Sequence, residues 1–112
     1  MIVLTTPANE QSVYWVTIEF WDEADNAMAP DVAAWTLSDL MGNLINARED
    51  ISITDPGIEE TVELSGDDLA VDGNDIVQRI ITLEGTYTSV TYGADKPFKF
   101  QIKFPIEPVI IV

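Results

Sequence analysis

The residues best suited to chemistry in this chain are carboxylates, and their densest group lies between residues 67 and 75. The segment Asp67-Asp68-Leu69-Ala70-Val71-Asp72-Gly73-Asn74-Asp75 holds four aspartates and one asparagine. Hard oxygen ligands of this kind suit Ca²⁺, but the spacing is not that of an EF-hand and no glutamate closes the loop at the required offset. Asp, Asn and Gly also favour turns. We therefore interpret the segment as a solvated acidic loop with one helical turn near residues 67–70, and expect no bound metal.

Other groups that enzymes use are scarce in this sequence. The chain contains no histidine and no cysteine, which excludes imidazole bases, thiol nucleophiles, Ser-His-Asp triads, zinc-finger ligation and disulfides. Adjacent carboxylates such as Glu59 and Glu60 point to opposite faces of a strand, whereas general acid–base catalysis needs two of them held across one cleft. The sequence therefore predicts a protein that is not an enzyme and needs no cofactor.

The charge of the chain is strongly negative. Its 112 residues include 20 Asp and Glu against 5 Lys and Arg, a formal net charge of −15. Phosphates of nucleic acids and anionic membrane surfaces repel such a chain, and no segment approaches the ~20 apolar residues of a membrane helix. We expect neither nucleic acid nor a membrane as a partner. Lys96, Lys99 and Lys103 are expected to pair with acidic strands beside them; the alternative is a small basic stripe that docks on an acidic neighbouring subunit.

Outward-facing aromatic side chains are the first candidates for a binding surface. Trp15 and Trp21 fall on the mixed, outward parity of residues 12–21. An outward tryptophan on a strand is covered either by another part of the chain or by another molecule. Together with Tyr87 and Tyr92 these side chains also suit a sugar-binding face, but a protein contact is the favoured interpretation.

The C-terminal end offers a second candidate for partner binding. Val109, Ile110, Ile111 and Val112 are apolar, carry no charge and follow two prolines. An uncharged β-branched segment left in water is prone to pair with another strand. We expect this tail to be ordered, either beside residues 1–4 in the chain's own sheet or as a strand added to a neighbouring subunit.

The elements that must position these residues have the period of strands. In residues 12–21, Tyr14, Val16, Ile18 and Phe20 form an apolar face that alternates with a mixed face, as expected for a half-buried strand. The same period of two predicts further strands at residues 32–39, 44–47, 51–54, 58–64, 76–88 and 98–104.

Two residues within these strands need separate interpretations. Gly85 interrupts the strand at residues 76–88 and is expected to mark a bulge. Arg79 falls on the apolar parity of the same strand, which indicates either a local break in register or a guanidinium paired with a carboxylate at the sheet edge.

Strand number and spacing indicate the fold class. About seven short strands, with turn signals about every 8–12 residues, predict an all-β fold. We expect residues 1–112 to form a single immunoglobulin-like antiparallel β-sandwich of about seven strands, with Trp35 in the place of the core tryptophan of such domains. A small open barrel is the alternative.

Strand-and-turn patterns recur in residues 16–25, 29–30, 34–39, 42–46 and 79–87. Together these segments, with the phenylalanine-rich strand that follows them, resemble small immunoglobulin-like domains encoded by tailed bacteriophages. Such domains are commonly virion accessories that decorate capsids, form head fibres or lie on tail surfaces. The resemblance covers most of the chain and brings no catalytic residues to carry over. The chain departs from the family in its acidity and its apolar C-terminus.

The resemblance implies a non-enzymatic structural or interaction module of a larger assembly, in particular a phage virion accessory such as a capsid decoration or cement protein or a head or tail surface protein. Its acidity would keep many copies soluble before assembly. The alternative is a carbohydrate- or receptor-binding module of a phage tail or bacterial surface. The N-terminal residues lack the pattern of a secretory signal, so we expect synthesis in the bacterial host cytoplasm and a final location in the virion. Its partners would be protein subunits of that assembly, and a homo-oligomer is an open alternative.

Overall fold

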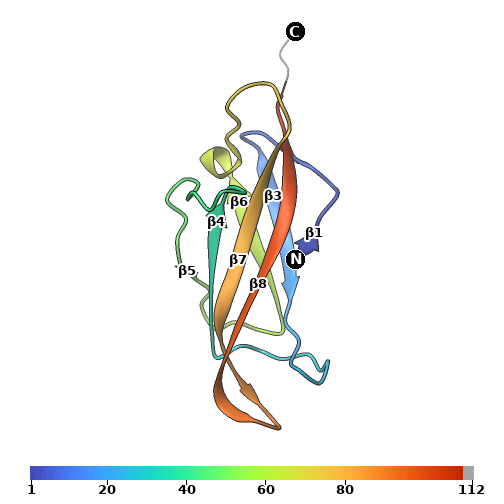
Figure 1. The fold of residues 1–112 in the computed structure, drawn as a ribbon, viewed down its shortest axis with the longest axis vertical. Coiled ribbons are helices and arrows are strands. Elements are labelled where there is room, and N and C mark those ends of the chain that lie inside the picture. Colours follow the sequence, from blue (N-terminus) through green and yellow to red (C-terminus); the bar gives the residue numbers. More distant parts are fainter. Residues whose placement is uncertain (110–112) are drawn as a thin grey trace.

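Strands provide nearly all the regular structure of the computed structural model, which describes residues 1–109 (Figure 1). No α-helix occurs among these residues, so the all-β prediction is confirmed; no helix there is long and apolar enough to cross a membrane. One 3₁₀ turn, η1 at Gly66–Leu69, confirms the helical turn expected in the acidic loop. The strands are β1 (Ile2–Val3), β2 (Ala8–Asn9), β3 (Val13–Glu19), β4 (Val32–Ser38), β5 (Ile51–Ser52), β6 (Glu59–Ser65), β7 (Val77–Ser89) and β8 (Gly93–Glu107).

These strands form two sheets. The larger has the order β1-β8-β7-β4-β5, with β2 also paired to β8. In the described part of the chain, the smaller sheet consists of β3 and β6 alone. The long hairpin of β7 and β8 projects beyond the other strands at one end of the molecule (Figure 1). β1 and β2 run parallel to β8, so the expectation that all strands are antiparallel is wrong at this edge. Residues 1–9 run along the outer edge of β8, the longest strand, in the same direction as β8.

Side-chain alternation places one apolar layer between the two sheets. Val16, Ile18 and Phe20 are buried, which confirms the inward face that alternation predicted for residues 12–21. Trp35 and Leu37 of β4 are buried on the same basis. The inward faces of β6, β7 and β8 complete the layer with Val62, Leu64, Ile81, Leu83, Ile102, Phe104 and Ile106.

Aromatic rings join the smaller sheet to β8. The ring of Tyr14 stacks on that of Phe104 with centroids 5.1 Å apart. The ring of Phe20 meets that of Phe98 edge-on at 5.7 Å. Such geometries suit the ring quadrupoles and add about 0.5–1.5 kcal/mol per pair beyond the area that they bury.

Two predicted strands are shorter or absent in the structure. Residues 44–47 form a loop with a single bridge between Leu44 and Ser38, and Asn46 and Ala47 both have positive φ. A strand there is therefore wrong, because side-chain contacts described below hold the loop in another conformation. The strand expected at residues 51–54 is reduced to β5.

Gly85 does not mark a bulge, as the sequence had suggested. It pairs in register with Ala33, and the irregularity of the hairpin lies further on, between Tyr87 and Ser89. A Cβ atom at Gly85 would instead collide with the backbone carbonyl of Val32. Glycine is therefore required because β4 and β7 approach one another closely at this point.

Replacing Gly85 with alanine should destabilise the fold. A Gly85→Ala variant must displace backbone atoms, and we expect the free energy of unfolding in urea to fall by about 1–3 kcal/mol or more. Gly57→Ala is the matched control, since a Cβ there meets nothing nearer than 3.6 Å, and its cost should stay within about 0.5 kcal/mol. Equal stability of the two variants would contradict the close approach of β4 and β7.

Candidate functional site

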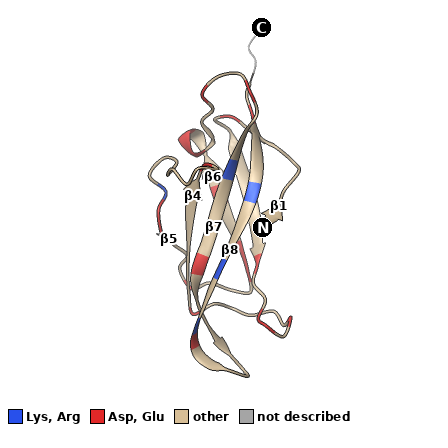
Figure 2. Cartoon of the chain, viewed as in Figure 1, with Lys and Arg blue, Asp and Glu red and all other residues tan. Residues whose placement is uncertain are grey.

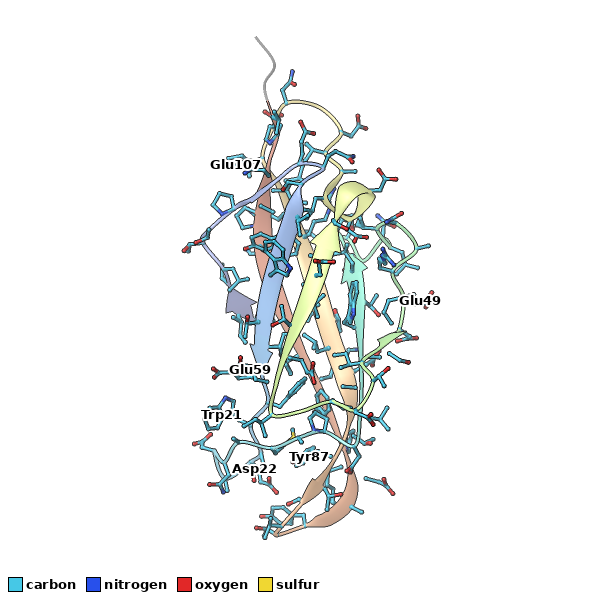
Figure 3. All side chains as sticks on the ribbon, turned by 180° about the vertical axis from the view of Figure 1, so that it is seen from behind. Trp21, Asp22, Glu49, Glu59, Tyr87 and Glu107 are labelled. Carbon is cyan, nitrogen blue, oxygen red and sulfur yellow. The ribbon has the colours of Figure 1, made fainter. Side chains whose placement is uncertain are left out.

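The outward face of the smaller sheet carries both tryptophans that the sequence singled out. Trp15 lies on β3 and is 62% exposed; Trp21 lies just beyond the end of β3 and is 55% exposed. The indole N–H of Trp15 donates a hydrogen bond of 3.1 Å to Oε1 of Glu63 on the neighbouring strand, which orients the ring. Figure 3 shows Trp21 projecting from the chain beside Asp22. The predicted outward parity is confirmed, and no described part of the chain buries either side chain.

The same face is acidic and lacks basic partners. Glu19 and Glu59 are directly opposed across β3 and β6, an arrangement in which like charges destabilise a sheet. The ion pairs of residues 1–109 lie elsewhere: Arg48 with Asp68, and the exposed Lys99 with Glu84 at 3.9 Å. Apart from Arg48 in the loop before β5, the basic residues lie along β7 and β8 of the larger sheet (Figure 2). The face of β3 and β6 therefore carries negative charge that no ion pair within residues 1–109 neutralises.

An apolar groove of about 350 Å³ lies beside this face, between β3 and the edge formed by β1 and β8. Its walls include Ile18 and Trp21 from the side of β3, and Phe100 and Ile102 from β8. The N-terminal segment contributes Ile2 and Leu4, and Leu4 is fixed by its N–H bond to the carbonyl of Lys103. The sequence did not predict this groove, because its walls come from segments that are far apart along the chain.

The predicted C-terminal site is described only at its first residue. Val109 is exposed, and its N–H donates to Oε1 of Glu10 at 2.7 Å. Ile110, Ile111 and Val112 lie outside the described residues. Within the described residues, β1 has β8 as its partner, so pairing of the tail with β1 or with another subunit stays a prediction.

The acidic loop turns one carboxylate inward instead of presenting all of them to solvent. Asp68 is 1% exposed and accepts hydrogen bonds from Arg48 Nε at 2.8 Å, Asn46 Nδ2 at 2.9 Å and the Ser65 N–H at 3.1 Å. These contacts hold the loop before β5 against η1. Within residues 1–109, no group of three or more acidic side chains is placed to hold a metal ion.

Hydrogen bonding and burial act on Asp68 in opposite directions. Burial raises the pKa of this carboxyl, but the hydrogen bonds from Arg48, Asn46 and Ser65 outweigh burial, so that the pKa lies below its ordinary value. Asp68 is therefore a charged structural anchor.

Arg79 makes neither of the arrangements that the sequence suggested. The register is unbroken where Arg79 opposes Phe104. Its guanidinium donates to the backbone carbonyls of Gln78 at 3.0 Å and Ala70 at 3.4 Å, and it forms no ion pair in the described part of the chain. Burial of the side-chain stem is compatible with the apolar parity because the polar end reaches carbonyl groups.

The two candidate tyrosines lie in the projecting hairpin. The hydroxyl of Tyr87 donates to Oε2 of Glu23 at 3.4 Å, and Ser89 Oγ donates to the other oxygen of that carboxylate. Tyr92, in the turn between β7 and β8, is 67% exposed beside the nearly fully exposed Val90. The hairpin therefore places these tyrosines on a different element from Trp15 and Trp21.

Comparisons of the chain with protein-family models, with curated proteins and with solved structures found no significant match.

The anchor at Asp68 predicts how stability depends on pH. The pKa of Asp68 is lower in the folded than in the unfolded chain. Its contribution to the free energy of unfolding is therefore fully present above the unfolded pKa of about 3.9, and is lost as the pH falls through the folded pKa. Asp68→Asn should lower the free energy of unfolding at neutral pH by about 1–3 kcal/mol and reduce the loss of stability in acid. Asp67→Asn, at an exposed neighbour, is the control. Equal acid sensitivity of wild type and Asp68→Asn in urea unfolding would refute this role.

Proposed function

We propose that the chain folds as an immunoglobulin-like β-sandwich. The order β8-β7-β4-β5 corresponds to strands G, F, C and C′ of variable-type domains, and the pair β3-β6 to strands B and E,. Trp35 lies on β4, the counterpart of strand C, and is 8% exposed, which is the place of the core tryptophan in such domains.

We further propose that this domain is a non-enzymatic module that docks on a protein subunit of a larger assembly through the face of β3 and β6. The observation that carries the proposal is the exposure of Trp15 on β3 and of Trp21 just beyond it, on the outward parity that also holds the polar Thr17 and Glu19. Tryptophan is enriched among residues that dominate the energy of protein interfaces. Their exposure beside an apolar groove supports a surface that a partner covers.

The assembly that we propose is a bacteriophage particle, with the domain as a decoration, cement or surface protein. The resemblance of the strand-and-turn pattern to phage-encoded domains supports this assignment. The net charge of −15 would keep free copies apart before they attach. Glycan or receptor binding is the second candidate function, since Trp21 beside an open groove is also an arrangement that stacks on a sugar ring.

Mass spectrometry of purified particles tests the main proposal. We expect to find the wild-type chain in the particles. For the double variant Trp15→Ala with Trp21→Ala, the amount of chain in the particles should fall about tenfold or more, as when two central interface residues are removed. Tyr92→Ala removes an aromatic side chain of the hairpin that is at least as exposed as either tryptophan, and this variant should stay in the particles. Absence of the wild-type chain from particles would contradict the virion proposal, whereas full retention of the double variant would contradict the docking face alone.

A glycan array separates the two candidate functions. The docking proposal predicts no saturable binding of the wild-type chain to any defined sugar. Binding that disappears in Trp21→Ala would replace the structural role with the carbohydrate-binding one.

A further inference from the structure

The edge of β3 that faces away from β6 offers unpaired peptide groups. Hydrogen-bonded and non-hydrogen-bonded pairs alternate along an antiparallel ladder. The Phe20 N–H donates a hydrogen bond of 3.0 Å to the carbonyl of Ile58. Ile18 opposes Glu60 in the same register, so the even-numbered residues of β3 are the ones that bond β6. The intervening residues, Trp15, Thr17 and Glu19, therefore direct their N–H and C=O groups toward the opposite edge. Within the described residues, no strand is paired with that edge.

This free edge borders the apolar groove. Thr17, Ile18 and Glu19 all line the groove on the side of β3, and Phe100 and Ile102 face them from β8. β8 is paired on this side only where β1 and β2 lie, from Ile102 onward. An extended chain placed in the groove would thus meet peptide donors and acceptors of β3 together with apolar side chains.

Taking the proposed docking face as its basis, we propose that a partner protein binds by adding one extended strand to β3. Side chains of an added strand alternate between two faces. One set would enter the groove against residues such as Ile102, and the other would lie outside beside Glu19. Strand addition of this kind takes affinity from main-chain bonds and specificity from the alternate side chains.

Charge determines what the added strand must carry. The outward set would lie beside Glu19, which already opposes Glu59 without a basic partner in the described chain. Lysine or arginine in the outward set would remove this repulsion. A second copy of this chain, itself at −15, would increase it. The partner segment is therefore extended and alternates cationic with apolar residues.

Synthetic peptides test this inference on the complete wild-type chain. The probe alternates lysine and valine, and two controls of equal length either alternate glutamate and valine or hold the same lysines and valines in two blocks. We expect saturable quenching of tryptophan fluorescence by the alternating lysine peptide, weakened at high salt. Both controls should bind about tenfold more weakly or not at all. Equal binding of the block peptide would show charge attraction alone and overturn strand addition.

Two proline variants locate the binding edge. Thr17→Pro removes an N–H that points away from the β3–β6 ladder, and Thr61→Pro does the same on β6 directly opposite. Both sites are exposed, and proline is tolerated at such outward positions of edge strands. Thr17→Pro should lower the affinity of the chain for the alternating peptide by about tenfold, and Thr61→Pro should leave this affinity unchanged. Equal affinity of folded Thr17→Pro and wild type would overturn the inference.

A measurement on the wild type covers the case in which Thr17→Pro does not fold. The amide resonances of Thr17 and Glu19 should shift when the alternating peptide is added, while that of Thr61 should not. Peptide binding without a shift at Thr17 would place the peptide elsewhere. A third outcome separates this inference from the proposed function. If the wild-type chain is found in particles and the double tryptophan variant is not, but the alternating peptide does not bind, strand addition is overturned and the proposed docking function stands.

Discussion

The structure depends on one apolar layer shared by two sheets of unequal width. A ribbon of two strands is at best marginally stable in water, so β3 and β6 need the larger sheet to cover their inner face. Tyr14 and Phe20 provide this contact through rings on β8, and Val16, Ile18 and Leu64 fill the space between. Since successive side chains of a strand point to opposite faces, this inward set also determines which residues lie outside.

The same constraint produces the candidate binding surface. Burial of the even-numbered side chains of β3 turns Trp15 and Glu19 outward. Among residues 1–109, the smaller sheet has only two strands, which leaves the far edge of β3 without a ladder partner. The larger sheet holds most of the basic residues (Figure 2), so the outward face of the smaller sheet stays negative. Exposed tryptophans, an apolar groove and unneutralised carboxylates thus occur together, which supports a docking surface for a basic partner.

Period-two patterns predicted the parts of the fold that depend on local sequence. The inward parities of residues 12–21 and 32–39, and the burial of Trp35, followed from alternation alone and are confirmed. The parallel pairing of β1 and β2 with β8 was not predicted, because two-residue segments leave no periodic signal. The loop at residues 44–47 was misassigned because its conformation depends on contacts to the distant Asp68. For the candidate site, the outward tryptophans could be found from parity, whereas the groove could not.

Hydrogen exchange of backbone amides in the isolated chain tests the open edge of β3 most directly. The structure predicts alternation along one strand: slow exchange at Tyr14, Val16 and Ile18, whose N–H groups bond β6, and fast exchange at Trp15 and Thr17. NMR resolves each amide under conditions where the chain stays folded. Fast exchange at alternate residues would support an edge that is free to accept a partner strand. Uniform protection along β3 would mean that a strand already covers this edge, and would contradict the account.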